Sequence, residues 1–189
     1  MLEQILDVDL IIFEFINQSF TNGFLDFTLP WLREKLFWAP LYMFIASFFV
    51  MNFNYKGIYM IILILLTVLL TDQISSSIIK PLVERLRPCN TEDLKEQIRV
   101  LVNCGSGYSF TSSHAANHFG LATFLSTCLK SRFKWVRPTV YFWAFIVSYS
   151  QVYVGVHYPT DILGGMLLGI LIGSLSGFFG RMALARELH

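Results

Sequence analysis

Charged residues are scarce in this chain. Only 14% of its 189 residues are Asp, Glu, Lys or Arg, whereas 54% are hydrophobic. Soluble domains carry about a quarter charged residues, so this composition favours a membrane protein. The formal net charge is +1 and no long basic tract is present, which argues against a nucleic-acid partner. The first fourteen residues carry four acids and no basic residue, which argues against a cleavable signal peptide.

Cysteine is also rare, and its spacing excludes the common metal-binding patterns. The three cysteines are Cys89, Cys104 and Cys128, and they do not form a metal-site spacing. Cys128 lies in an apolar run, which is typical of a small buried side chain. Cys89 and Cys104 lie within the one long polar loop, residues 88–111, and are therefore candidates for a disulfide.

Long hydrophobic runs predict an all-α, polytopic membrane bundle that forms a single domain over residues 1–189. About 20 residues in a helix cross the hydrocarbon core of a bilayer. The run at 112–129 has the weakest hydropathy signal because it begins with polar residues. Five spans are predicted, at residues 36–53, 57–79, 112–129, 138–156 and 162–180.

The N-terminal residues 1–34 differ from the predicted bundle at 35–186. Their apolar residues are mixed with acids, Asn17 and Asn22, and Pro30 is expected to break the run. This pattern predicts one or two short helices that lie at the membrane interface. A sixth, short span is the alternative, which would bring the total to six.

The last predicted span carries glycine at every fourth position. Residues four apart lie on nearly the same face of a helix. Such a stripe lets a neighbouring membrane helix approach closely, so it predicts helix packing and not chemistry. The four glycines are Gly165, Gly169, Gly173 and Gly177.

Basic residues indicate how the bundle is oriented. Lys and Arg concentrate in short cytoplasmic loops. The loop at 130–137 is rich in basic residues and has no acid, so it is predicted to be cytoplasmic and the 88–111 loop extracytoplasmic. The protein is expected in a bacterial inner membrane, with its active site on the periplasmic side. The basic residues on the predicted cytoplasmic side are Lys56, Lys130, Arg132, Lys134, Arg137, Arg181 and Arg186.

This orientation bears on the two loop cysteines. Disulfides persist outside the cytoplasm. A bridge between Cys89 and Cys104 would close a loop of about 15 residues and stabilise the fold by about 3 kcal/mol in the chain-entropy model. Two free thiols are the alternative.

Three polar clusters fall on the predicted outer side, and the first is KPLVERLRP, residues 80–88. Lys80 and Arg87 are seven residues apart, which is two helical turns and about 10 Å along the axis if the helix continues. Their long side chains would then converge on one anion. Arg85 would point elsewhere on that helix. The alternative is that these cations reach toward lipid headgroups.

The second cluster opens the span at 112–129. Thr111, Ser112 and Ser113 precede an apolar run, which is a helix N-cap signal. The start of a helix is a natural phosphate site. His114 would lie beside that anion, whose charge favours a protonated imidazole and suits a general acid. The alternative is a capped helix with an interfacial histidine, and His118, one turn deeper, is interpreted as a packing residue.

The third cluster contains His157 and Asp161, beside Pro159. Proline is common at the first position of a helix, so His157 would precede a helix and Asp161 would lie in its first turn. A carboxylate that binds one imidazole nitrogen leaves the other free to attack. The alternative is a structural His–Asp pair.

The order of these motifs, K-x6-RP, then S-H, then H-x3-D, resembles the type 2 phosphatidic acid phosphatase superfamily, which also includes vanadium haloperoxidases. The resemblance covers residues 80–161 in its motifs and nearly the whole chain in its spans. It implies that His157 forms a phosphohistidine, Asp161 orients it and His114 protonates the leaving oxygen. Lys80, Arg87 and the turn of Ser112 and Ser113 would bind the phosphate. No metal or other cofactor is implied, because cations and backbone donors stabilise the charge.

Two positions depart from the family pattern. Ser113 stands where the family usually has glycine, which adds a side chain beside the phosphate. Gln151 stands six residues before His157, where the family usually has arginine. Gln151 is still expected to face the phosphate, but it can only donate a hydrogen bond and brings no charge.

The resulting function is a membrane lipid phosphatase that acts through a phosphohistidine at the extracytoplasmic face. Undecaprenyl diphosphate is the favoured substrate, and phosphatidylglycerol phosphate, phosphatidic acid and lipid A phosphate are alternatives. A catalytically weak lipid-binding membrane protein is the alternative of another class. A metal-dependent enzyme or transporter that uses His114, His157 and Asp161 as ligands is a third. The sequence leaves the oligomeric state open.

Overall fold

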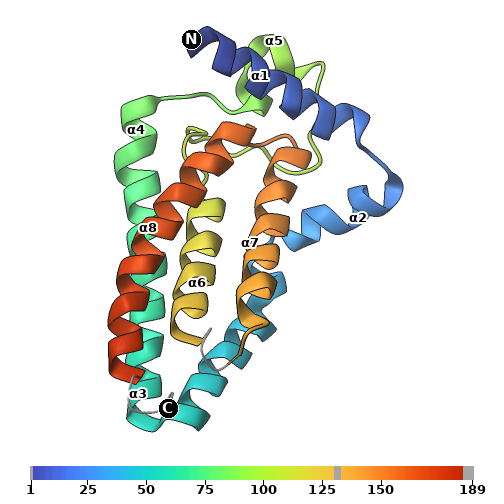
Figure 1. The fold of residues 1–189 in the computed structure, drawn as a ribbon. Coiled ribbons are helices and arrows are strands. Elements are labelled where there is room, and N and C mark those ends of the chain that lie inside the picture. The colour runs from blue at the N-terminus through green and yellow to red at the C-terminus, as the bar shows by residue number, and fades with distance from the viewer. Residues whose placement is uncertain (1, 130–132, 185–189) are drawn as a thin grey trace.

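The structure is a computed structural model that describes residues 2–129 and 133–184. The described part of the chain is helical and contains no strand. Figure 1 shows the long helices side by side, with the first helix across one end of the bundle. The α-helices are α1 (Leu2–Glu14), α2 (Gly23–Leu32), α3 (Ala39–Gln73), α4 (Lys80–Val83), α5 (Glu92–Lys95), α6 (Ser113–Leu129), α7 (Val136–Tyr153) and α8 (Pro159–Leu184).

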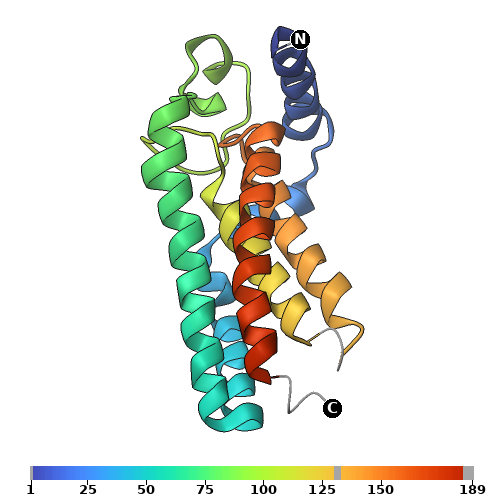
Figure 2. The same ribbon diagram turned by 60° about the vertical axis from the view of Figure 1, so that its left-hand side comes forward.

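The first two predicted spans form one folded-back element, α3. Its two arms meet at Asn54, whose φ of 49° and ψ of −129° break the helix, so no separate loop over 51–56 is needed. Figure 2 shows the two arms joined at the end of the bundle where the chain finishes. The second arm continues through a π-helical turn, Ile74–Ile79, into α4. Lys35–Val83 and Pro159–Leu184 are the two described stretches that are long and apolar enough to cross a membrane.

α6 occupies the centre of the bundle, between α3, α7 and α8 (Figure 1). Almost every residue of α6 from Ala115 onward is buried. This position explains the weak hydropathy of the 112–129 run. Because other helices and not lipid cover α6, it can carry alanine, glycine and hydroxyl side chains that suit close helix contact.

α8 has two contrasting faces. Its glycine stripe lies against α6, where a Cβ atom added at Gly169 would overlap the backbone oxygen of Ala116. The close packing predicted from the stripe is therefore confirmed. The opposite face exposes large apolar side chains, an arrangement that suits contact with lipid. These are Leu163, Leu167, Leu171 and Leu175, each 51–66% exposed.

The N-terminal helices lie outside the bundle, with α1 across one end of it and α2 beside α7 (Figure 1). α1 has 13 residues and α2 has 10. At 1.5 Å per residue α2 extends about 15 Å, too short for a core of about 30 Å. α1 continues into a π-helical stretch, Phe15–Ser19. Pro30 does not break the run as predicted, because it lies inside α2, which continues to Leu32.

Asn17 ties the N-terminal region to the bundle. It is fully buried, and its Nδ2 donates to the backbone oxygens of Arg99 at 2.7 Å and Tyr153 at 2.8 Å. Its Oδ1 accepts the backbone N–H of Arg99 at 2.9 Å. One side chain thus joins the N-terminal region, the 88–111 loop and the end of α7.

Of the basic residues predicted to be cytoplasmic, Lys130, Arg132 and Arg186 lie outside the described residues.

Candidate active site

His157 lies in the short connection between α7 and α8, with 2% of its surface exposed. Its Nδ1 is 3.3 Å from Oδ2 of Asp161, in the first turn of α8. Its Nε2 is 3.4 Å from Nη1 of Arg87. Because a guanidinium only donates hydrogen bonds, Nε2 is the acceptor and the ring proton is assigned to Nδ1, facing the carboxylate. The unprotonated Nε2 of the ring therefore faces Arg87.

The surroundings of His157 also determine its charge. Burial lowers the pKa of His157 to about 4, and the hydrogen bond and charge of Asp161 oppose this shift only in part. Desolvation disfavours the charged form of an imidazole. The ring is therefore neutral at pH 7, which is the protonation state that a nitrogen nucleophile requires.

Arg85 also belongs to the candidate site, because it contacts Asp161, and the sequence did not predict this contact. Its Nη1 donates to Oδ1 of Asp161 at 2.9 Å, and its Nη2 donates to Oδ2 of Asp9 at 2.6 Å. Its guanidinium lies 3.8 Å from the centre of the Tyr158 ring. The Oδ2 atom of Asp161 also accepts the backbone N–H of Tyr158 at 2.8 Å. Arg85 therefore holds the carboxylate that contacts His157.

The physical reason is that the helix of Lys80 does not continue to Arg87. α4 ends at Val83, and Glu84 adopts a left-handed conformation with φ 53° and ψ 24°. A positive φ at a residue other than glycine is uncommon and marks a local turn. No periodicity in the sequence signals this turn, so a helical projection of residues 80–87 gives the wrong directions for the arginines.

Lys80 and Arg87 nevertheless contact the same segment, residues 105–109. The Nζ atom of Lys80 donates to the backbone oxygen of Tyr108 at 2.7 Å. The Nε atom of Arg87 donates to the backbone oxygen of Gly107 at 2.9 Å. The two cations are therefore brought to one loop by the turn after α4 and not by a shared helix face.

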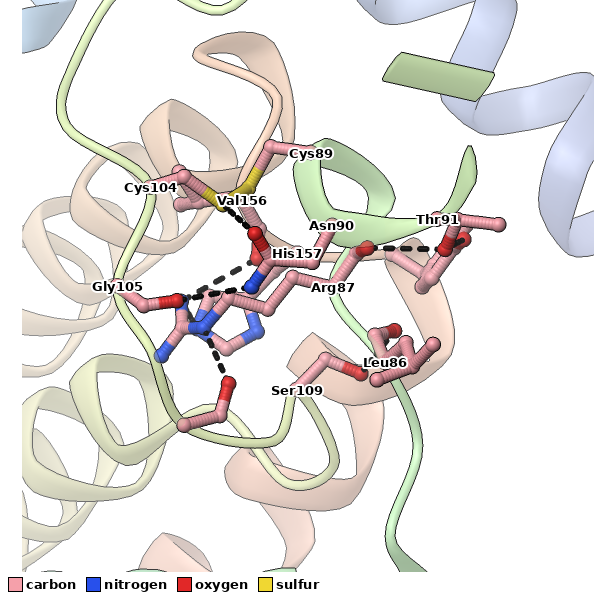
Figure 3. Close-up of a disulfide and its surroundings, with 12 residues drawn as sticks. Leu86, Arg87, Cys89, Asn90, Thr91, Cys104, Gly105, Ser109, Val156 and His157 are labelled. Atoms are coloured by element: carbon pink, nitrogen blue, oxygen red, sulfur yellow. Dashed lines mark hydrogen bonds between the residues drawn. A yellow bond between two sulfur atoms is a disulfide. The ribbon is translucent and has the colours of Figure 1, made fainter. Parts of the chain in front are cut away.

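A disulfide between Cys89 and Cys104 holds this loop, with the two Cα atoms 6.0 Å apart. Asn90 adds a hydrogen bond from Nδ2 to the backbone oxygen of Gly105 at 3.0 Å. In Figure 3 the Arg87 side chain extends past the disulfide toward the His157 ring. The structure thus contains the disulfide that the sequence allowed as one of two alternatives. This disulfide holds the loop that Arg87 contacts.

The start of α6 lies against α8 and the turn that precedes α4. The Oγ atom of Ser112 accepts the backbone N–H of Ala115 at 3.4 Å, and the backbone N–H of Ser112 donates to the oxygen of Asp161 at 3.0 Å. The Oγ atoms of Ser113 and Ser75 are 2.9 Å apart, so the extra hydroxyl of this chain is already hydrogen-bonded. The N–H groups of a first helical turn lack partners within the helix and suit an anion.

Gln151 supports His157 through its backbone. The backbone oxygen of Gln151 accepts the N–H groups of Val156 and His157, each at 3.2 Å. Its side chain is fully buried, and neither amide atom has a hydrogen-bond partner among the described residues. Buried amides are normally paired, so this side chain has hydrogen-bonding capacity to offer a ligand.

His114 lines a cavity of about 590 Å³ between the two arms of α3 and α6. Asn117 and Asp72 line the same cavity, and Nδ2 of Asn117 donates to Oδ1 of Asp72 at 3.2 Å. His118 packs on Trp143 with ring centres 4.9 Å apart. The remaining wall is largely apolar, with Ile45, Ala46, Ile61, Ile64, Leu65, Val68, Leu69 and Leu121.

Residues 61–179 match the PAP2 superfamily. The chain is 35% identical over 189 residues to a lipid A 4'-phosphatase of Bacteroides thetaiotaomicron, which covers 98% of this chain and 83% of the relative. It is 30% identical over 177 residues to an undecaprenyl-diphosphatase of Sulfolobus acidocaldarius, which covers 92% of this chain and 79% of the relative. Both relatives are named as phosphatases, and both names specify a lipid.

Two solved structures share the fold. A transmembrane PAP2-type phosphatidylglycerolphosphate phosphatase from Bacillus subtilis matches with a TM-score of 0.73 at 24% identity, over 95% of this chain and 87% of that one. LpxE of Aquifex aeolicus matches with a TM-score of 0.67 at 26% identity, over 89% and 94%. The helical membrane fold and the lipid phosphatase class expected from the sequence are confirmed. The chain therefore belongs to the PAP2 superfamily.

Proposed function

We propose that this chain removes a phosphate from lipid A at the extracytoplasmic face of the membrane, through a phosphohistidine on His157. The choice of lipid A as the substrate rests on the 35% identity to a lipid A 4'-phosphatase, which extends over 98% of this chain.

The geometry supports a two-step reaction. Nε2 of His157 attacks phosphorus while Nδ1 keeps its proton and its contact with Asp161. His114 donates a proton to the leaving sugar oxygen as the P–O bond breaks, and then activates the water that cleaves the P–N bond. Lys80 and Arg87 bind the phosphoryl oxygens, together with the first-turn N–H groups of α6.

The cavity beside His114 supports a lipid substrate. It joins polar side chains near the start of α6 to an apolar wall between the arms of α3. Ligand pockets commonly combine an apolar lining with a few polar groups that fix orientation. A phosphate near His114 would leave an attached acyl chain facing this apolar wall.

Charge and the disulfide support the extracytoplasmic side. The loops at the opposite end carry Lys56, Lys134, Arg137 and Arg181, and the described residues of 51–57, 133–139 and 181–184 contain no acid. Such loops are typical of the cytoplasmic side. The Cys89–Cys104 bridge lies at the site end, which suits an oxidising compartment.

A polyprenyl diphosphate is the second candidate. The sequence favoured it, and the 30% identity to an undecaprenyl-diphosphatase supports it. The two substrates differ at the leaving group, because lipid A loses a phosphate from a sugar hydroxyl and the diphosphate loses one from another phosphate.

A substrate panel in detergent tests the proposal. We expect released phosphate to be greatest with lipid A, and mass spectrometry to show the loss of one phosphate from it. Undecaprenyl diphosphate, phosphatidylglycerol phosphate and phosphatidic acid complete the panel, each compared with His157→Ala. Faster turnover of another lipid would replace lipid A as the substrate. No phosphate release from any of them would favour a lipid-binding protein.

A structural prediction concerns Asp9, which links α1 to the site. Its Oδ1 accepts the backbone N–H of Thr160 at 2.8 Å, and its Oδ2 accepts from the Thr160 hydroxyl and from Arg85. We expect Asp9→Ala to destabilise the fold by about 2–4 kcal/mol, because it removes a helix cap and a buried partner of a charge. Thermal unfolding in detergent should show a lower midpoint. Asp7→Ala is the control, and an equal midpoint for both variants would contradict the role of Asp9.

A further inference from the structure

Arg33 is a largely buried guanidinium that the mechanism above does not use. It follows the last residue of α2, and 15% of its side chain is exposed. Its Nε is buried and has no hydrogen-bond partner among the described residues. Its Nη1 is 3.6 Å from Oε1 of Glu34, and the Glu34 side chain is 59% exposed. A buried donor without an acceptor is costly, so this position suits an anionic ligand.

The segment that carries this arginine is attached beside the candidate site. The indole Nε1 of Trp38 donates to the backbone oxygen of Leu32 at 2.7 Å, which satisfies a carbonyl at the end of α2. The Trp38 ring packs edge-on against Trp143, with centres 5.6 Å apart. Trp143 in turn contacts His118, whose Nδ1 is 2.8 Å from the backbone oxygen of His114.

The Arg33 segment also packs near Arg87. Leu32 belongs to the apolar cluster that contains Cys89, Cys104 and Val156, which surround the Arg87 side chain, and Val156 directly precedes His157. Burial lowers the pKa of Arg87, Asp161 opposes that shift, and the charge of Arg33 lowers the pKa further. Like charges repel, and an anion held between Arg33 and Arg87 would be attracted by both.

Gln151 approaches the same region from α7. Leu32, the residue before Arg33, belongs to an apolar cluster with Tyr149 and Tyr153. The side chain of Gln151 leaves α7 on another face than these tyrosines, and its backbone oxygen accepts the N–H of His157 at 3.2 Å. The side chain is fully buried, and its amide has no partner among the described residues. The amide of Gln151 and the guanidinium of Arg33 thus both have hydrogen-bonding capacity to offer a ligand.

We propose that Arg33 binds the phosphoryl group of the substrate as a third cation, beside Lys80 and Arg87. This inference rests on the proposed function, because it assigns a further contact to the same phosphate. The planar guanidinium presents paired donors that match phosphate oxygens. The family usually has an arginine at the position of Gln151 in α7. In this chain Arg33, from the N-terminal region, would then supply that positive charge.

The test uses the full chain in detergent with orthovanadate, a mimic of five-coordinate phosphorus, as the probe. We expect Arg33→Gln to weaken vanadate inhibition and to lower kcat/KM, each by about 10- to 100-fold, the usual effect of losing a charged hydrogen bond. Arg33→Lys should retain part of both values because it keeps the charge. Arg137→Gln, an exposed arginine at the opposite end, should match wild type.

A double variant sharpens the test. If positions 33 and 151 serve the same phosphate, Gln151→Arg should restore vanadate inhibition in the Arg33→Gln background and add much less to the wild type. Unchanged vanadate inhibition in Arg33→Gln would overturn the inference, even if turnover falls, because that pattern indicates a structural role. If Gln151→Arg does not fold, the Arg33→Lys comparison decides.

The same experiment separates this inference from the proposed function. Vanadate binding can be followed by the rise in Tm that a bound ligand produces, without any turnover. A wild type that binds vanadate but cleaves no lipid in the panel contradicts the proposed function alone. A wild type that cleaves lipid, with Arg33→Gln equal to it in vanadate-dependent Tm, contradicts the inference alone.

Discussion

His157→Ala should abolish phosphate release, with kcat/KM lower by on the order of 10⁴-fold or more, as expected when a covalent nucleophile is removed. The ring of His157 is buried, its Nδ1 faces Asp161 and its Nε2 faces Arg87. No other histidine among the described residues has a carboxylate contact of this kind. The measurement is released phosphate with saturating and limiting lipid.

A trapped intermediate provides the decisive comparison. Rapid denaturation of the wild type with radiolabelled substrate should leave an acid-labile phosphate on the protein, and His157→Ala should carry none. Because burial lowers the pKa of His157 to about 4, kcat/KM should stay high at pH 6 and fall as the pH approaches 4. Label that persists in His157→Ala would assign the nucleophile elsewhere.

His114→Ala should lower turnover of the lipid by about 10²- to 10⁴-fold, the usual contribution of a general acid. The physical reason is the leaving group, because a sugar alkoxide is strongly basic and must be protonated as it departs. An aryl phosphate with an acidic phenol needs no such proton. We therefore expect His114→Ala to lower kcat/KM for the aryl phosphate by less than about 10-fold, because kcat/KM reports the phosphorylation step, and the later activation of water by His114 affects only kcat.

The ratio of these two losses distinguishes proton donation from phosphate binding. Asp161→Asn is the matched comparison, because it disturbs the orientation of His157 and should slow both substrates to a similar degree. Equal losses for the lipid and the aryl phosphate in His114→Ala would show that His114 binds phosphate and is not the acid.

The local geometry of the short motifs could be predicted because the residues involved are close in sequence. His157 and Asp161 are separated by a single turn at the start of α8, so four residues of sequence are enough to place them together. Ser112 precedes α6 and accepts the N–H of Ala115, as its hydroxyl and position indicate. Contacts of this range depend on helix geometry alone.

Arg85, in the first motif, shows what local reasoning could not predict. Its direction depends on the left-handed conformation of Glu84, which no hydrophobic period reveals. Its partner Asp9 lies 76 residues away, in a region that the sequence assigned only to the membrane interface. A buried acid in an N-terminal helix is visible in the sequence as a charge among apolar residues, but its partner is not.

By itself, the sequence determined the membrane class, the helical bundle, the PAP2 family and the His–Asp pair, because composition, periodicity and short spacing carry that information. Only the tertiary structure decided that α6 is the central helix, that Lys80 and Arg87 contact one disulfide-held loop, and that Asp9 and Arg85 hold Asp161. Only it packed Leu32, the neighbour of Arg33, with Cys89, Cys104 and Val156. The reason is that these contacts join segments far apart in the chain, and turns with no periodic signal set their directions.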